Sequence, residues 1–275
     1  MKIEPQNDII HVAYSPSLNQ YLEKSGNKFD LPCPLLHKSL TEKKLTKTSS
    51  YKIVAFIPMR HHSQRVPGKN YRLLAGKPLF HHIVETLLAV PQVTEIVVDT
   101  DSDRVMESLS RQFPQVSIIN RPEHLRADDV PMNDILIYDT AQVQADFYLQ
   151  THSTNPLLKP ETISRAIQSL LSNSPKYDSL FSVTRLQTRL YFQDGRAINH
   201  DPTVLIQTQD LPPVYEENSC LYIFTRENLV KRHHRIGETP FMFEIDTEEA
   251  WDIDEELDFA ITDFLLRRKS QIESP

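Results

Sequence analysis

The chain has 275 residues, and its 37 Asp and Glu against 30 Lys and Arg give a formal net charge of −7. This length fits one large domain, or one domain with an elaboration, and the acidic balance argues against nonspecific binding to nucleic acid. No apolar run approaches the roughly 20 residues that a membrane-spanning helix needs, and the first residues contain no hydrophobic signal core. Cys33 and Cys220 make neither a disulfide framework nor a metal knuckle, so we expect a cytoplasmic protein. A metal ion and an anionic small substrate remain compatible with this composition.

Residues 1–50 lack clear periodicity and end in the polar stretch LTEKKLTKTSS. We expect them to form an N-terminal extension that is weakly ordered or docked. The main domain is expected over residues 51–271.

From residue 52 onward, expected strands and helices alternate at the spacing of βαβ units. Apolar runs predict strands over 53–57, 95–100, 116–120, 146–150, 179–185 and 221–225. Helical periodicity and start signals predict helices over 78–90, 104–113, 133–144, 161–171 and 255–268. The predicted fold is an α/β domain with a mostly parallel sheet and helices on both faces.

One segment interrupts this alternation. Asp194-Gly195, a strong hairpin-turn signal, lies between short expected strands at 189–193 and 196–200. A hairpin inside a βα alternation indicates an excursion from the main sheet, here about 185–214, of the kind often used for dimerisation or as a lid.

The first predicted strand leads into a basic loop, in the sequence IPMRHHSQRVPGKN. The loop carries cations, a hydroxyl and an amide at Arg60, Ser63, Arg65, Lys69 and Asn70. Because parallel sheets of α/β proteins bind phosphates where a strand ends, this concentration of charge predicts a triphosphate site. The alternative is an ordinary basic surface loop.

Two carboxylates near the C-terminus, Asp252 and Asp254 in the sequence WDID, are spaced i and i+2. On a strand this spacing places both on one side, where they can share a hard cation. The alternative is a solvated, acid-rich helix entrance, since acids crowd the whole of residues 244–258.

The motifs IPMRHHSQRVPGKN, LAGKP, VVDTD, RPEHLRADD, TNPLL, YEENSCLYIF and WDIDEELDF follow one another over residues 52–269. In this order they resemble the cytidylyltransferases that make CMP-activated acidic sugars, the CMP-sialic acid and CMP-Kdo synthetases. The resemblance implies a Rossmann-like fold of the nucleotide-diphospho-sugar transferase type. It also implies a Mg²⁺-dependent reaction in which the anomeric hydroxyl of a 2-keto-3-deoxy acid sugar attacks the α-phosphate of CTP and pyrophosphate leaves.

The resemblance also implies roles for individual residues. Arg60, Ser63, Arg65 and Lys69 would grip the triphosphate, with Asn70 close to the nucleotide. Asp252 and Asp254 would bind the metal, and Asp101 would share the metal or orient the nucleotide. The groups expected to be catalytic are Arg60, Lys69, Asp101 and Asp254.

The chain departs from the family pattern at the base site and at the phosphate loop. Asp99 stands where a serine near the base is usual, and its carboxylate could accept from cytosine or equally from guanine. His61 and His62 occupy positions where two glycines are common. Arg121 is expected to contact the nucleotide or sugar, the alternative being a structural ion pair in its loop.

The expected acceptor site lies in the sequence LQTHSTNPLL, which differs from the family's LQPTSPLR. The candidates for reading the acidic sugar are Gln150, His152, Thr154 and Asn155. Arg185 could meet the sugar carboxylate or form an ion pair at the base of the hairpin.

Three further expectations follow. The family usually dimerises through the inserted hairpin region, so a homodimer is predicted. A related nucleotidyltransferase with another base such as GTP, or with another acceptor, is the first alternative. A degenerate nucleotide-binding protein without turnover is the second.

Overall fold

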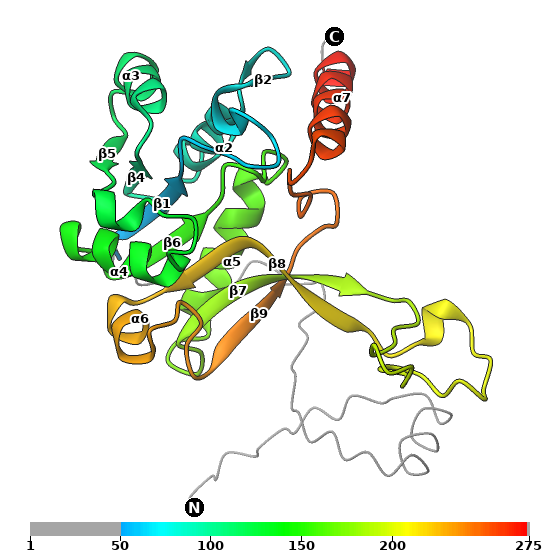
Figure 1. The fold of residues 1–275 in the computed structure, drawn as a ribbon. Coiled ribbons are helices and arrows are strands. Elements are labelled where there is room, and N and C mark those ends of the chain that lie inside the picture. Colours follow the sequence, from blue (N-terminus) through cyan, green and yellow to red (C-terminus); the bar gives the residue numbers. More distant parts are fainter. Residues whose placement is uncertain (1–50, 274–275) are drawn as a thin grey trace, which may run out of the picture. The chain divides into compact units, whose positions relative to one another are not determined.

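The computed structural model describes residues 51–273 of the chain. The predicted extension over residues 1–50 lies outside the described residues. Within the described part, a seven-stranded sheet has the order β5-β4-β1-β6-β8-β7-β9, as Figure 1 shows. The strands are β1 Ile53–Met59, β4 Glu95–Thr100, β5 Ser117–Asn120, β6 Phe147–Thr151, β7 Ser179–Leu186, β8 Val214–Phe224 and β9 Pro240–Glu244. A separate two-stranded hairpin pairs β2 Leu73–Leu74 with β3 Lys77–Pro78.

Strand directions confirm the predicted mostly parallel sheet. β5, β4, β1 and β6 are mutually parallel, and β7 and β9 are parallel to each other. β8 runs antiparallel to both of its neighbours, β6 and β7, which places it as the reversed strand of the sheet.

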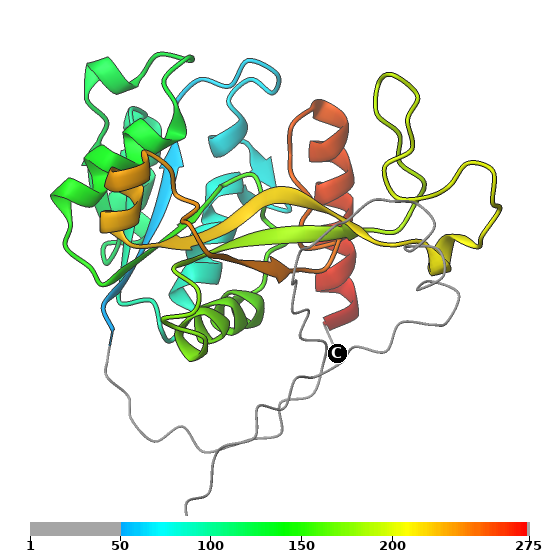
Figure 2. The ribbon, with the colours of Figure 1, turned by 90° about the horizontal axis from the view of Figure 1, so that it is seen from below.

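Helices cover both faces of the sheet because the strands are buried on both sides. Along β1, Ile53, Ala55 and Ile57 belong to one hydrophobic core, whereas Val54 and Phe56 belong to another, as the alternation of side chains along a strand requires. The first core packs against α2 Leu79–Leu88, α3 Asp103–Gln112 and α5 Pro160–Ser172. The second packs against α4 Met132–Gln142 and α6 Arg226–Arg232. Figure 2 shows α5 and α6 on opposite sides of the sheet.

The predicted excursion is present as an arm formed by residues 187–213 (Figure 1). β7 and β8 pair antiparallel out to Leu186 and Val214, and the chain between them leaves the sheet. The expected strands at 189–193 and 196–200 reduce to one bridge between Tyr191 and Ala197, closed by a turn in which Gly195 has a φ of 85°. A short 3-10 turn, η3 Thr208–Asp210, leads back toward β8.

The C-terminal helix α7 Glu256–Glu273 packs beside the β2–β3 hairpin. Its apolar residues Leu257 and Phe264 are 68% and 61% exposed. The buried side carries Phe259, which joins Val66 and Leu74 in a third core cluster beside the β2–β3 hairpin. The buried face of α7 is therefore set by its contacts with this hairpin and with Ile253, which the apolar periodicity of the helix does not reveal.

Candidate functional site

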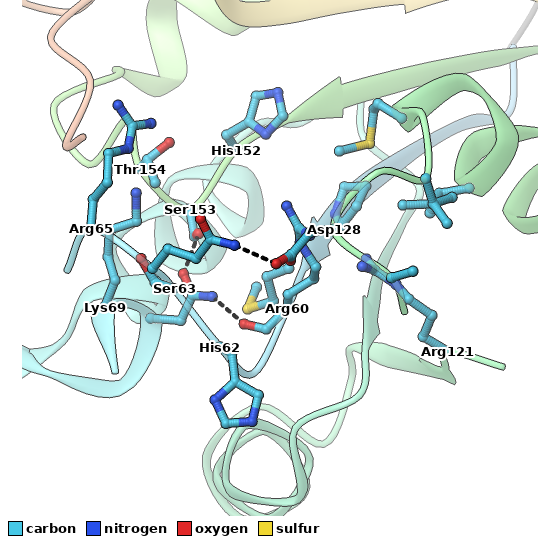
Figure 3. A pocket seen from close by; sticks show the side chains of 18 residues that line it. Arg60, His62, Ser63, Arg65, Lys69, Arg121, Asp128, His152, Ser153 and Thr154 are labelled. Atoms are coloured by element: carbon cyan, nitrogen blue, oxygen red, sulfur yellow. Dashed lines mark hydrogen bonds and ion pairs between the residues drawn. The ribbon is translucent and has the colours of Figure 1, made fainter. Parts of the chain in front are cut away.

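A cavity of about 470 Å³ opens beyond the carboxyl ends of β1 and β6. Its walls come from the loop after β1, the segment between β5 and α4, the start of α4, and the loop after β6 (Figure 3). The lining residues are Pro58, Met59, Arg60, His62, Ser63, Gln64, Arg65, Lys69, Asn70, Arg121, Ala127, Asp128, Val130, Met132, Ile135, His152, Ser153 and Thr154.

The predicted basic loop forms one wall of this cavity. All five of its candidate residues, Arg60, Ser63, Arg65, Lys69 and Asn70, lie in the lining. The side chain of Asn70 stabilises the loop. It donates to the Arg60 carbonyl at 2.8 Å and accepts from the Ser153 hydroxyl at 2.7 Å. The structure therefore brings together the residues that the sequence proposed for triphosphate binding.

Carboxylates pair with two of these cations. Arg60 forms an ion pair with Asp128, which also accepts from Gln64. Arg65 donates to Asp254 at 2.6 Å. Both arginines are therefore paired with carboxylates, so an anionic ligand in the cavity must compete with these carboxylates.

Lys69 connects the basic loop to the WDID segment. Its amine donates to the Ile253 carbonyl at 2.6 Å and lies 4.0 Å from a carboxylate oxygen of Asp254. Burial lowers the pKa of Lys69, and the charges of Asp252 and Asp254 oppose that shift. The lysine is thus held as a fixed donor at the junction of the two motifs.

The WDID segment is not a strand, contrary to the premise of the metal prediction, since residues 251–254 have no regular structure. Its position is fixed instead by the amide of Ile253, which donates to the Thr154 carbonyl at 3.0 Å. Burial raises the pKa of Asp252, and a hydrogen bond from Thr154 opposes the shift. One oxygen of Asp252 is buried and has no hydrogen-bond partner among the described residues.

Asp101 does not complete a metal cluster with these two carboxylates. Its side chain accepts the backbone N–H of His61 at 2.6 Å and so holds the start of the basic loop. Over residues 51–273, no group of three or more His, Cys, Asp or Glu side chains is arranged to hold a metal ion. Asp252 and Asp254 remain the pair that could share one.

A buried charge cluster lies behind the cavity. Arg121 lines the cavity but is only 1% exposed, and it donates to the Asp99 carboxylate at 2.8 Å. Asp99 is fully buried behind Arg121 and does not line the cavity. Burial raises the pKa of Asp99 to about 6, with Arg121 opposing the shift.

Asp139 of α4 is the third member of this cluster. Both of its carboxylate oxygens are buried and lack a hydrogen-bond partner among the described residues. Burial raises the pKa of Asp139 to about 8, and the nearby charge of Asp99 adds to the shift. The raised pKa favours the protonated form of Asp139, whereas the ion pair with Arg121 favours the charged form of Asp99.

The predicted sugar-binding residues divide into two groups. His152 and Thr154 line the cavity. Gln150 is fully buried beneath His152, and the buried Asn155 side chain donates to the Trp251 carbonyl at 3.4 Å. Arg185 is exposed on β7, where the strand leads toward the arm, and it does not line the cavity.

Sequence reasoning gave no role to several residues that shape the site. Gln64 and Asp128 could have been found, because both stand inside motifs already singled out. Asp139 and Arg235, a half-buried arginine hydrogen-bonded to Gln150, carry no local signal. Their roles arise from contacts between distant elements.

The sequence profile of the family described as Cytidylyltransferase matches residues 54–271. The chain belongs to the cytidylyltransferase family. It is therefore a nucleotidyltransferase enzyme, and the basic loop, Arg121 and the WDID segment lie inside the matched region.

Two cytidylyltransferase relatives and one solved structure show how far the likeness extends. A CMP-N,N'-diacetyllegionaminic acid synthase from Legionella pneumophila is 32% identical over 232 residues, which cover 78% of this chain and 96% of that protein. An N-acylneuraminate cytidylyltransferase from Escherichia coli is 23% identical, over 80% of this chain and 53% of that protein. The structure of CMP:2-keto-3-deoxy-manno-octonic acid synthetase complexed with CTP matches with a TM-score of 0.57 and 18% identity, covering 79% of this chain and 99% of that one.

The likeness to this solved structure shows that the cytidylyltransferase has a Rossmann-like fold. In the described residues, no helix is both long enough and apolar enough to cross a membrane.

Proposed function

We propose that this cytidylyltransferase transfers CMP from CTP to the anomeric hydroxyl of an acidic 2-keto-3-deoxy sugar and releases pyrophosphate. One observation carries the proposal. Arg60, Arg65 and Lys69 of the loop after β1 line a cavity that is also lined by the neutral polar side chains of His152 and Thr154 from the loop after β6. A polyanion and a polyhydroxylated acceptor fit these two surfaces.

The cations would serve the chemistry as well as binding. In phosphoryl transfer, charge spreads over the phosphoryl oxygens, so fixed donors stabilise the transition state more than the ground state. Lys69 meets this requirement best, because its side chain is only 12% exposed and its amine is oriented by the Ile253 carbonyl. Arg60 and Arg65 would exchange their carboxylate partners for phosphate oxygens.

A divalent cation fits beside these groups. Mg²⁺ in nucleotide sites is usually held by one or two carboxylates together with phosphate oxygens. Asp252, with its unpartnered buried oxygen, and Asp254 provide such a pair next to Lys69. The ion would neutralise charge on the triphosphate and assist the departure of pyrophosphate.

The deciding experiment measures pyrophosphate release by the purified protein with Mg²⁺. CTP, GTP, UTP and ATP are each tested against N-acetylneuraminate, legionaminate derivatives and Kdo. Turnover with CTP and one acidic sugar is expected. Turnover with GTP alone would replace the base in the proposal, and absence of both turnover and CTP binding would overturn it.

Replacing Asp254 with Asn tests the metal assignment. Asp246→Asn is the matched control, because Asp246 is an exposed carboxylate near the same segment. We expect the Asp254 variant to lose Mg²⁺-dependent turnover while the control retains it. Equal activity of the two variants would remove Asp254 from the metal site.

We further propose that the protein is a homodimer joined through the arm of residues 187–213. The arm exposes apolar side chains far from the domain's cores, among them Leu205 at 92% and Tyr191 at 51%. Exposed apolar residues gathered on one extension are typical of an interaction surface. Light scattering at micromolar concentration should give the mass of two chains, and a single-chain mass would contradict the proposal.

A further inference from the structure

Three hydrogen-bonded side chains, Arg235, Gln150 and His152, connect the segment between α6 and β9 to the cavity. Arg235 donates from its guanidinium to the Gln150 side-chain oxygen at 2.6 Å. The Gln150 side-chain nitrogen lies 2.8 Å from Nε2 of His152. Gln150 is fully buried, whereas His152 lines the cavity, on the same side as Thr154 in Figure 3.

The chemistry of these groups fixes the direction of both hydrogen bonds. A guanidinium can only donate, so the group of Gln150 that faces Arg235 must be its oxygen. The amide nitrogen of Gln150 is then the group that faces His152, and it can only donate. Nε2 of His152 must therefore accept, which leaves the proton of the neutral ring on Nδ1.

Arg235 is itself held firmly. Its guanidinium lies 3.5 Å from the centroid of the Tyr222 ring, a cation–π contact. The Tyr222 hydroxyl in turn donates to Glu217. The fixed arginine thus sets the orientation of Gln150, and burial together with the charge of Arg235 lowers the pKa of His152 to about 3.

We propose that Arg235 and Gln150 are positioning residues that fix His152 as a neutral imidazole with its Nδ1–H available to an oxygen of the acidic sugar. This inference rests on the proposed function. Among residues 51–273, Nδ1 of His152 has no hydrogen-bond partner, so its donor is free for a ligand.

The sugar, rather than the triphosphate, is the partner for this donor because of its charge and position. The triphosphate has three cations on the wall formed by the loop after β1. His152 belongs to the loop after β6, and it stays uncharged. A neutral donor with a fixed direction selects an acceptor by geometry and adds little to the binding of a polyanion.

The tautomer can be measured in the protein without any ligand. In protein labelled with ¹⁵N-histidine, long-range ¹H–¹⁵N correlation spectra distinguish a ring protonated at Nδ1 from one protonated at Nε2, and the His152→Asn spectrum assigns the signal among the 11 histidines. We expect the Nδ1–H form in the wild type. An Nε2–H form or an imidazolium at neutral pH would overturn the inference.

Gln150→Glu tests whether Gln150 sets the tautomer. A carboxylate can only accept, so the ring would have to donate from Nε2, and the wild-type pattern at His152 should disappear. Glu217→Gln is the control, because it alters the far end of the network without touching Gln150. An unchanged His152 pattern in Gln150→Glu would show that Gln150 does not position it.

Two substitutions at His152 test the contact with the sugar. Asn can place a donor near the position of Nδ1, whereas Leu has similar bulk and no donor. We expect His152→Leu to raise the KM for the sugar about tenfold, as loss of one hydrogen bond would, while CTP affinity measured by calorimetry stays unchanged. His152→Asn should stay within about threefold of the wild type in KM.

The outcomes separate this inference from the proposed function. Equal sugar KM values for His152→Leu, His152→Asn and the wild type would refute the contact while leaving the reaction intact. Absence of turnover by the wild type with every nucleotide and sugar would refute the proposed function, and the sugar contact with it. The tautomer measurement would still report on Arg235 and Gln150 in that case.

Discussion

Replacing Asp139 with Asn should stabilise the protein, and the gain should depend on pH. The Asp139 carboxyl is fully buried, and neither oxygen has a hydrogen-bond partner among the described residues. Burial raises its pKa from 3.8 to about 8, so the folded state keeps a proton that the unfolded state releases. Between those two values the wild type must take up a proton in order to fold, and its stability falls as the pH rises.

The size of the effect follows from the same shift. Each pH unit in this window costs about 1.4 kcal/mol, so the penalty at pH 7, roughly three units above 3.8, is about 4 kcal/mol. Asn has nearly the same shape and does not titrate. The variant should therefore be more stable than the wild type by up to about 4 kcal/mol at pH 7, and the two should be nearly equal below the unfolded pKa.

Urea unfolding followed by circular dichroism, at several pH values from about 4 to about 8, gives the free energy of unfolding for both proteins. Asp129→Asn, at an exposed carboxylate that precedes the same helix, controls for the change in net charge. A difference in stability that stays constant across this range, or a less stable variant at pH 7, would refute the assignment of the proton to Asp139.

Three other substitutions test the site and the arm. Arg60→Gln should lower kcat/KM for CTP by roughly 10- to 150-fold, the equivalent of one charge-assisted hydrogen bond, whereas the exposed Arg111→Gln should leave it unchanged in a steady-state assay. Gly68→Ala should destabilise the fold by about 1–2 kcal/mol in thermal unfolding, because Gly68 has a φ of 66° and an added Cβ would lie 2.7 Å from the Tyr71 ring; an unchanged Tm would contradict this. Leu205→Asp should convert a dimer into monomers in analytical ultracentrifugation, and a dimer that persists would place the interface elsewhere.

The sequence was informative where the signal is local. The strand over 95–100 was predicted with the bounds of β4, and the basic loop could be recognised because its side chains lie within 11 positions of one another. α6 and β9 were not predicted, since Arg226–Arg232 is short and Pro240–Glu244 joins the sheet through its pairing with β7.

The parts of the site that escaped prediction depend on contacts over long separations. Arg235 meets Gln150 across 85 positions, and no pattern near either residue signals this hydrogen bond. Asp99 looked like a group that reads the base, but its partner Arg121 covers it, and burial of this kind is visible only once β4 and the segment after β5 are placed side by side.

The ion pair between Arg65 and Asp254 joins two segments that are 189 positions apart, and Lys69 lies beside the same carboxylate. A divalent cation that took this carboxylate would release Arg65 for phosphate oxygens, while Lys69 would keep its hydrogen bond to the Ile253 carbonyl. Occupancy of one subsite then changes the affinity of the other, and thermodynamic reciprocity requires the two effects to be equal. If bound metal changes the affinity for nucleotide by some factor, bound nucleotide must change the affinity for metal by the same factor. Titrations that start with either ligand should therefore give the same coupling free energy.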